Sequence, residues 1–228
     1  MMILVTGGSA SGKSEFAEQC VLSFGERKRF YVATMIAWDE ECRKRIQRHR
    51  AMRAKKNFDT IEQPVDLKQA MVPPGSAVLL ECVSNLAANE LFREMPGQGK
   101  ALPADRQEEK RTESARQRIL EGILSLKAQC GHLVVVTNEV FSDGEQYDVE
   151  TEGYRMLLGD INCRLAAMAD EVYEVACGIP TVLKKGPEGQ NWKETRPEKR
   201  PGEPETGKAA ETGNRVRQNQ EEEKRMYI

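Results

Sequence analysis

A glycine-rich segment near the amino terminus carries the clearest chemistry in the sequence. Residues 7–14 fit the pattern G-x-x-x-x-G-K-[ST], between an apolar run and an amphipathic stretch. They are Gly7, Gly8, Ser9, Ala10, Ser11, Gly12, Lys13 and Ser14. In such a loop, backbone N–H groups and a helix N-terminus hold phosphate oxygens, the lysine reaches the β- and γ-phosphates, and the final hydroxyl suits Mg²⁺. The segment predicts nucleoside triphosphate binding without naming the reaction.

Two acidic residues follow apolar runs elsewhere in the chain. Glu81 ends the run 77–81, and Glu139 comes shortly after the run 133–137. Ligands bind at the carboxyl ends of parallel strands, and a P-loop site needs a second acidic group for the metal. Glu81 is therefore the preferred Mg²⁺ ligand beside Ser14, with Glu139 second. Either acid can instead simply begin a loop.

A basic segment with a histidine is the second candidate site. Over residues 39–53 an acidic start leads into a helical pattern that places Arg45, His49 and Arg53 on one face. Flanking arginines disfavour the charged imidazole, and a neutral imidazole is a nucleophile for a nucleotide α-phosphate. Spacing alone favours a simpler interpretation, a solvent-facing basic helix with an incidental histidine. His132, which precedes an apolar run, is interpreted as structural or exposed.

Short apolar runs alternate with helical patterns along the first 185 residues. The runs predict strands at 3–6, 29–33, 77–80, 133–137 and 171–176, and the helical patterns fall at 14–24, 40–55, 84–92, 112–129 and 152–170. A surface loop is expected over 95–112. Alternating strands and helices predict an α/β fold with a mostly parallel sheet.

Composition excludes several classes of protein. The 34 basic and 36 acidic residues give a net charge of −2, so no basic field predicts a nucleic-acid partner. No apolar run is long enough for a membrane span, and the amino terminus reads as a first strand rather than a signal peptide. The 6 cysteines form no C-x-x-C pair, which is typical of reduced thiols and predicts a cytoplasmic protein.

The carboxyl-terminal region differs sharply from the rest in composition. Only 4 of the 40 residues in 186–225 are apolar, too few to offset the entropy of ordering them. We therefore expect a folded domain over 1–185 and a charged, disordered tail over 186–228.

Several segments in a fixed order carry a family resemblance. They are the P-loop, Tyr-Val-Ala-Thr at 31–34, the histidine segment at 39–53, Leu-Leu-Glu-Cys at 79–82, Val-Thr-Asn-Glu-Val at 136–140 and the stretch 162–172. Together they resemble the bifunctional adenosylcobinamide kinase / adenosylcobinamide-phosphate guanylyltransferase family of cobalamin biosynthesis. The resemblance covers about residues 1–185.

The resemblance implies both a fold and a reaction sequence. It implies a RecA-like P-loop fold in a homotrimer that phosphorylates adenosylcobinamide with ATP or GTP. GMP is then transferred from GTP to the product through a guanylylated histidine, which corresponds to His49. The resemblance implies nucleotide contacts at Thr34, Arg50, Arg53, Glu62 and Glu81. From its place on the same helix face as His49, we expect Arg45 to assist the transfer.

Two segments depart from the family pattern. Ala10 stands where the family commonly has arginine, and residues 141–148 replace a glycine-rich stretch. A P-loop kinase without guanylyltransferase activity, or a P-loop regulatory or assembly module, therefore remains an alternative.

Overall fold

The computed structural model describes residues 1–36, 40, 56–93, 104–142 and 144–186. The chain divides into two units, Met1–Trp192 and Lys193–Ile228, and the described residues all belong to the first. The helical segment predicted at 40–55 lies outside the described residues except for Glu40, which is helical.

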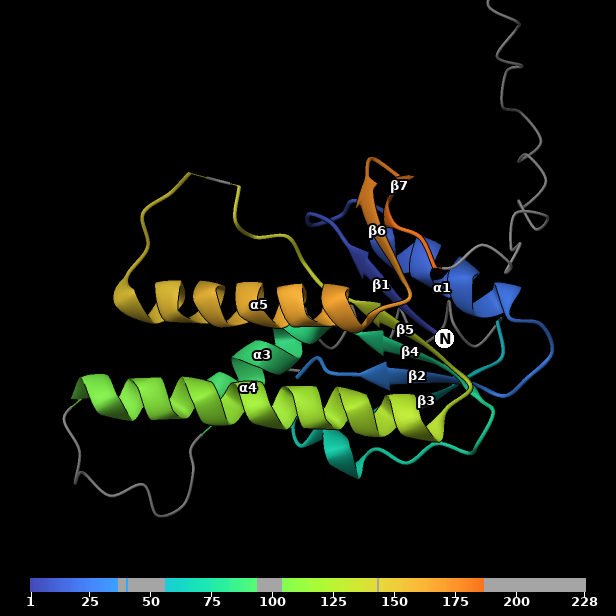
Figure 1. Cartoon of the computed structure of the whole chain (residues 1–228), viewed down its shortest axis with the longest axis horizontal. Coiled ribbons are helices and arrows are strands. Elements are labelled where there is room, and N and C mark those ends of the chain that lie inside the picture. The colour runs from blue at the N-terminus through green and yellow to red at the C-terminus, as the bar shows by residue number, and fades with distance from the viewer. Residues whose placement is uncertain (37–39, 41–55, 94–103, 143, 187–228) are drawn as a thin grey trace, which may run out of the picture. The chain divides into compact units, whose positions relative to one another are not determined.

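A seven-stranded sheet organises the described part of the chain (Figure 1). Its strands are β1 (Met2–Thr6), β2 (Arg29–Ala33), β3 (Phe58–Glu62), β4 (Ala77–Glu81), β5 (His132–Val136), β6 (Glu171–Ala176) and β7 (Ile179–Lys184). They lie in the order β3-β2-β4-β5-β1-β6-β7. All neighbouring pairs are parallel except β6 and β7, which are antiparallel. The carboxyl ends of six strands thus share one edge, where ligands bind in open α/β sheets.

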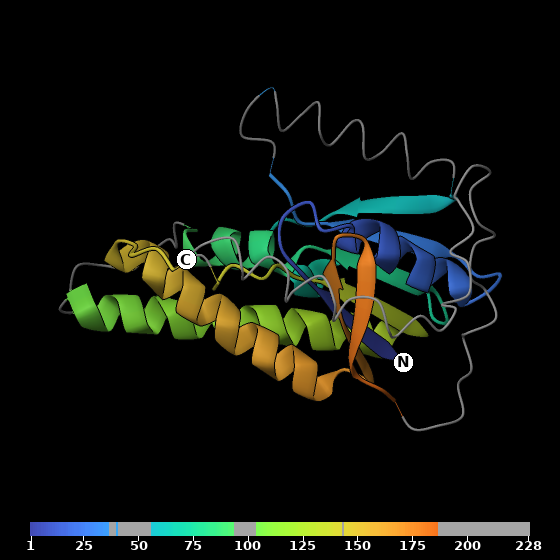
Figure 2. The same ribbon diagram turned by 90° about the horizontal axis from the view of Figure 1, so that it is seen from above.

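Helices cover both faces of this sheet. They are α1 (Lys13–Ser23), the short 3₁₀ turn η1 (Leu67–Gln69), α3 (Val83–Leu91), α4 (Ala104–Gln129) and α5 (Val149–Met168). In Figure 2, α1 lies on one face and α4 and α5 lie on the other. None of the described helices has the length and hydrophobicity to span a membrane.

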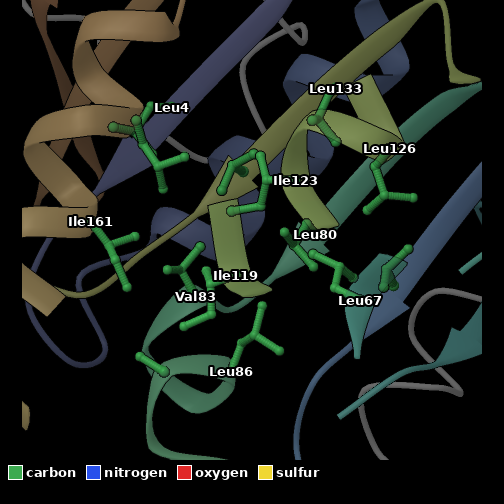
Figure 3. Close-up of a cluster of buried hydrophobic side chains, with 14 of the residues drawn as sticks. Leu4, Leu67, Leu80, Val83, Leu86, Ile119, Ile123, Leu126, Leu133 and Ile161 are labelled. Atoms are coloured by element: carbon green, nitrogen blue, oxygen red, sulfur yellow. The ribbon is translucent and has the colours of Figure 1, made fainter. Parts of the chain in front are cut away.

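Two hydrophobic clusters, one on each face, hold the layers together. The smaller joins α1 to the sheet through residues such as Val21 and Val136. Figure 3 shows the larger cluster, on the other face of the sheet. There Leu4, Leu80 and Leu133 of the strands lie among side chains of α3, α4 and α5. Burying each such side chain contributes roughly 1.5–3 kcal/mol. Continuous apolar runs in the central strands are explained by burial on both faces.

The predicted fold class and all five predicted strands are confirmed. The two edge strands, β3 and β7, were not predicted, because neither presents an apolar run to a core. Every residue of β7 is exposed, and only Phe58 of β3 is buried. The predicted loop over 95–112 is wrong from Ala104 onward, where α4 already begins. That stretch is rich in Glu, Lys, Arg and Gln, which favour helix without any apolar stripe.

Candidate active site

The P-loop connects β1 to α1 and is packed closely against neighbouring backbone. A Cβ added to Gly7 would lie 2.4 Å from the Val175 carbonyl oxygen, so no side chain fits there. Gly12 has φ +91°, and a Cβ on it would lie 3.0 Å from the Cα of Gly178. Both glycines of the motif are therefore required by the packing of the loop on β6 and its turn, in addition to any approach of phosphate.

Two backbone hydrogen bonds fix the loop to its neighbours. The Gly178 N–H donates to the Ser11 carbonyl at 2.8 Å, and the Glu139 N–H donates to the Gly7 carbonyl at 3.0 Å. The first comes from the turn between β6 and β7, where Cys177 and Gly178 both have positive φ. Consecutive positive φ values are typical of a two-residue hairpin turn. Sequence reasoning missed this support, although a glycine in a two-residue turn was a usable signal.

Lys13 lies at the start of α1 and folds back over the loop. The residue is 8% exposed, and its Nζ donates to the Gly8 carbonyl at 2.8 Å. The ammonium group is thus held at the loop whose backbone N–H groups can bind phosphate oxygens.

The structure brings Ser14 and Glu81 together, as the sequence analysis expected of a shared metal site. Both are half-buried, and the Ser14 hydroxyl donates to Oε1 of Glu81. Tyr31 donates its hydroxyl to the other carboxylate oxygen, Oε2, at 3.0 Å. In the register of the sheet Glu81 lies opposite Ala33 of β2 and Val136 of β5, at the carboxyl edge.

The donor set at this point fits Mg²⁺. Mg²⁺ in nucleotide sites takes one or two protein oxygens and completes its shell with water and phosphate oxygens. Ser14 and Glu81 supply one hydroxyl and one carboxylate beside the P-loop. Among the described residues no group of three or more His, Cys, Asp or Glu side chains could hold a metal alone.

Glu139, the second candidate ligand, has its carboxylate engaged in its own loop. Its Oε1 accepts hydrogen bonds from the Phe141 N–H at 2.7 Å and the Ser142 hydroxyl at 3.0 Å. In this structure the acid therefore organises the connection after β5.

The structure places Thr34 and Glu62 differently with respect to the loop. Thr34 is fully buried, and its hydroxyl both donates to the Cys82 carbonyl and accepts from the Cys82 N–H, each at 2.8 Å. Glu62 is exposed at the end of β3, in register with Ala33. Thr34 thus fastens β2 to the connection after β4, while Glu62 lies at the same sheet edge as Glu81.

The remaining predicted site residues lie outside the described residues. They are Arg45, His49, Arg50 and Arg53.

A polar network beside the site centres on Ser84. Asn138 donates its Nδ2 to the Ser84 hydroxyl at 2.6 Å, and the Cys82 thiol lies 3.0 Å from the same oxygen. Tyr154 donates to the Ser84 carbonyl at 3.2 Å. Burial raises the pKa of the Cys82 thiol, and burial followed by the neighbouring Cys82 raises the pKa of Tyr154 to about 12. Both groups therefore stay protonated at neutral pH.

Asn162 of α5 extends this network to the end of β5. It accepts a hydrogen bond from the Thr137 hydroxyl at 2.7 Å and donates to the Asn138 carbonyl at 3.3 Å. The segments 79–82 and 136–140, which carry part of the family resemblance, thus meet Asn162, the first residue of the segment 162–172, at one end of the sheet.

A phosphate-binding loop at the carboxyl edge of a parallel sheet, with a hydroxyl and a carboxylate paired beside its lysine, defines a P-loop protein of the nucleoside triphosphate-binding class. The family model described as "Cobinamide kinase / cobinamide phosphate guanyltransferase" matches residues 3–183. The chain belongs to this family and is an enzyme of the bifunctional kinase and guanylyltransferase type, which confirms the resemblance seen in the sequence.

Curated relatives agree with this assignment. The chain is 34% identical over 189 residues to "Bifunctional adenosylcobalamin biosynthesis protein CobU" of Escherichia coli strain K12, covering 81% of this chain and 100% of that protein. It is 34% identical over 198 residues to the protein of the same name from Salmonella typhimurium strain LT2, covering 81% and 100%.

Among solved structures, "Crystal structure of flagellar accessory protein FlaH from Methanocaldococcus jannaschii" aligns with a TM-score of 0.39 at 11% identity. The alignment covers 81% of this chain and 78% of that one.

Proposed function

We propose that this chain phosphorylates the aminopropanol hydroxyl of adenosylcobinamide with ATP or GTP, and then transfers GMP from GTP to the product. The final product is adenosyl-GDP-cobinamide, with release of pyrophosphate. The observation that carries the proposal is the Ser14–Glu81 pair beside the P-loop, in a chain whose family match spans residues 3–183. That match includes the segment of His49.

In the kinase step, the P-loop and Lys13 hold the triphosphate while the corrinoid hydroxyl attacks the γ-phosphorus. The new P–O bond forms as the bond to the β–γ bridging oxygen breaks, and the hydroxyl proton is released. Ser14 and Glu81 hold Mg²⁺, which offsets the negative charge of the phosphates when it is bound. The buried position of Lys13 removes its ammonium group from competing water and strengthens its attraction for phosphate.

In the guanylyltransferase step, the His49 imidazole attacks the α-phosphorus of GTP. A P–N bond forms, the α–β bridging P–O bond breaks, and pyrophosphate leaves. A phosphate oxygen of adenosylcobinamide phosphate then attacks the same phosphorus and releases the histidine. Arg45, Arg50 and Arg53 spread the developing negative charge, as arginine does for phosphate oxygens. Thr34 and Glu62 remain proposed nucleotide-binding positions on the strength of the family resemblance.

The setting of the enzyme belongs to the same proposal. We place the catalytic domain at residues 1–185 and assign 186–228 to a charged tail that takes no part in the reaction. We further propose a homotrimer in the cytoplasm, with a small-molecule corrinoid as the acceptor. A solution mass of three times the chain mass by light scattering supports the trimer, and a monomeric mass contradicts it.

Product analysis tests the proposed reaction sequence. The chain is incubated with adenosylcobinamide, Mg²⁺ and either ATP alone or ATP with GTP, and corrinoids are analysed by mass spectrometry. We expect adenosylcobinamide phosphate with ATP alone, and adenosyl-GDP-cobinamide once GTP is present. Lys13→Ala should abolish the phosphorylation, whereas Lys185→Ala, at an exposed lysine of the same chain, should not.

Two other results of this assay would change the proposed function. Phosphorylation without GMP transfer selects a kinase that lacks the second activity, and Ala10 then becomes the first position to restore to arginine. Absence of any corrinoid product from a folded, nucleotide-binding chain contradicts the proposed function.

A further inference from the structure

Tyr31 donates a hydrogen bond to Glu81, but the proposed reaction assigns no role to this tyrosine. Tyr31 is the third residue of β2 and is 6% exposed. In the sheet register it pairs with Leu79, two positions before Glu81 on β4. The length of the phenol side chain spans this offset, and the hydroxyl donates to Oε2 of Glu81 at 3.0 Å.

This hydrogen bond completes the restraint of the Glu81 carboxylate. Its Oε1 accepts a hydrogen bond from the Ser14 hydroxyl, and its Oε2 accepts one from the Tyr31 hydroxyl. Each carboxylate oxygen is therefore held by a different residue. A glutamate side chain otherwise loses considerable rotamer freedom when it is fixed by a ligand. Here the restraint exists in the folded protein itself and comes from a neighbouring strand.

We propose that Tyr31 is a positioning residue for the Mg²⁺–nucleotide complex. By holding Oε2 it keeps Oε1 directed at Ser14, so that the hydroxyl and the carboxylate can bind the metal together without reorganising. The inference rests on the role of Glu81 in the proposed function and adds the residue that orients it. Tyr31 acts through Glu81 and does not itself touch the nucleotide.

A second tyrosine in the chain provides a matched control. Tyr173 of β6 is 2% exposed, and its hydroxyl donates to Oε2 of Glu171 at 2.7 Å. It is thus also a buried tyrosine bonded to a glutamate, but its partner lies at the opposite end of its strand from the P-loop edge. Tyr173→Phe therefore removes a hydrogen bond of the same type without touching Glu81.

The test measures binding of a fluorescent, non-hydrolysable GTP analogue as free Mg²⁺ is varied. Tyr31→Phe should raise the half-saturating Mg²⁺ concentration about tenfold, the effect of losing one hydrogen bond to a charged group. Nucleotide affinity at saturating Mg²⁺ should return close to that of the parent chain. Tyr173→Phe should leave the Mg²⁺ requirement unchanged, and thermal unfolding of both variants shows that each is folded.

A double-mutant cycle separates this inference from the proposed function. Glu81→Ala should raise the Mg²⁺ requirement by itself, and adding Tyr31→Phe to it should have no further effect. If Glu81→Ala shifts the Mg²⁺ requirement and Tyr31→Phe does not, the positioning role is wrong while the metal site stands. The positioning role of Tyr31 is also wrong if Tyr173→Phe raises the half-saturating Mg²⁺ concentration as much as Tyr31→Phe does. If Glu81→Ala has no effect, the metal role of Glu81 fails, and this inference fails with it.

Discussion

Individual side chains at the nucleotide end of the sheet are held before any ligand arrives. Lys13 is bonded to the Gly8 carbonyl, Ser14 to Glu81, and Glu81 to Tyr31. Each contact joins groups that are distant along the chain or lie within the loop itself. Such preorganisation lowers the cost of fixing charged groups when the triphosphate binds.

Gly12 is, with Gly7, one of two positions where neighbouring backbone leaves the loop no room for a side chain. We expect Gly12→Ala to lower the free energy of unfolding by about 1–3 kcal/mol, because the added Cβ is strained at φ +91° and lies 3.0 Å from Gly178. Gly25→Ala is the matched control, since Gly25 has φ +80° with nothing within 4 Å of an added Cβ. Urea unfolding measures the free energy of unfolding of both variants. Equal losses would show that the packing of the loop on the hairpin contributes nothing.

His132 gives the molecule a predictable sensitivity to acid. Burial, then Arg27 and the amino terminus, lower its pKa below the ordinary value of 6.5. Its ring stacks on Phe24 with centroids 4.1 Å apart. The unfolded chain therefore binds a proton at a higher pH than the folded chain, so stability is lost as the pH falls below about 6.5.

His132→Phe should reduce that loss while keeping the stacked ring. The measurement compares the free energy of unfolding at neutral pH and at a pH one unit below the ordinary histidine pKa. Identical losses in the parent chain and the variant would contradict the assignment of this acid sensitivity to His132.

Among the helices and strands, β7 links the edge of the sheet to a helix end. Its Lys184 Nζ donates to the carbonyls of Ala166, Ala167 and Ala169 at 3.1, 3.1 and 2.6 Å, at the C-terminus of α5. The positive charge also complements the negative end of the helix dipole. An edge strand with no buried residue is therefore held by its pairing with β6 and by this cap.

Lys184→Met should lower the free energy of unfolding by about 1 kcal/mol through loss of the helix cap. Lys185→Met, at the next residue and also exposed, should change it far less. Chemical unfolding of the two variants under identical conditions makes the comparison. If both variants lose the same stability, the bonds to the α5 carbonyls are not what holds β7.

The sequence predicted the elements whose residues face a core and missed those that do not. Four of the five predicted strands were recognisable from nearly continuous apolar runs, and the fifth from its content of Val and Tyr. β3 and β7 were not recognisable, since their side chains are largely exposed. At the site, the pairing of Ser14 with Glu81 followed from the rule that ligands bind at carboxyl strand ends. The Tyr31 contact could not be predicted, because it depends on the register between β2 and β4.

For the chain as a whole, the family match ends at residue 183, shortly before the composition changes. Deleting residues 186–228 should therefore leave both proposed activities unchanged, because the removed residues contain few apolar side chains that could join a core. The corrinoid assay on the truncated and complete chains checks this. A large loss of either activity would show that the tail belongs to the catalytic unit.

The central claim is that one chain combines a P-loop site with a histidine that carries GMP. The direct measurement incubates the complete protein with Mg²⁺ and GTP labelled on the α-phosphate, without corrinoid, and follows label on the denatured chain. We predict acid-labile label that is absent with γ-labelled GTP, lost in His49→Ala, and retained in His132→Phe, which alters the only other histidine. A folded, GTP-binding chain that takes up no label, or label that persists in His49→Ala, would contradict the claim.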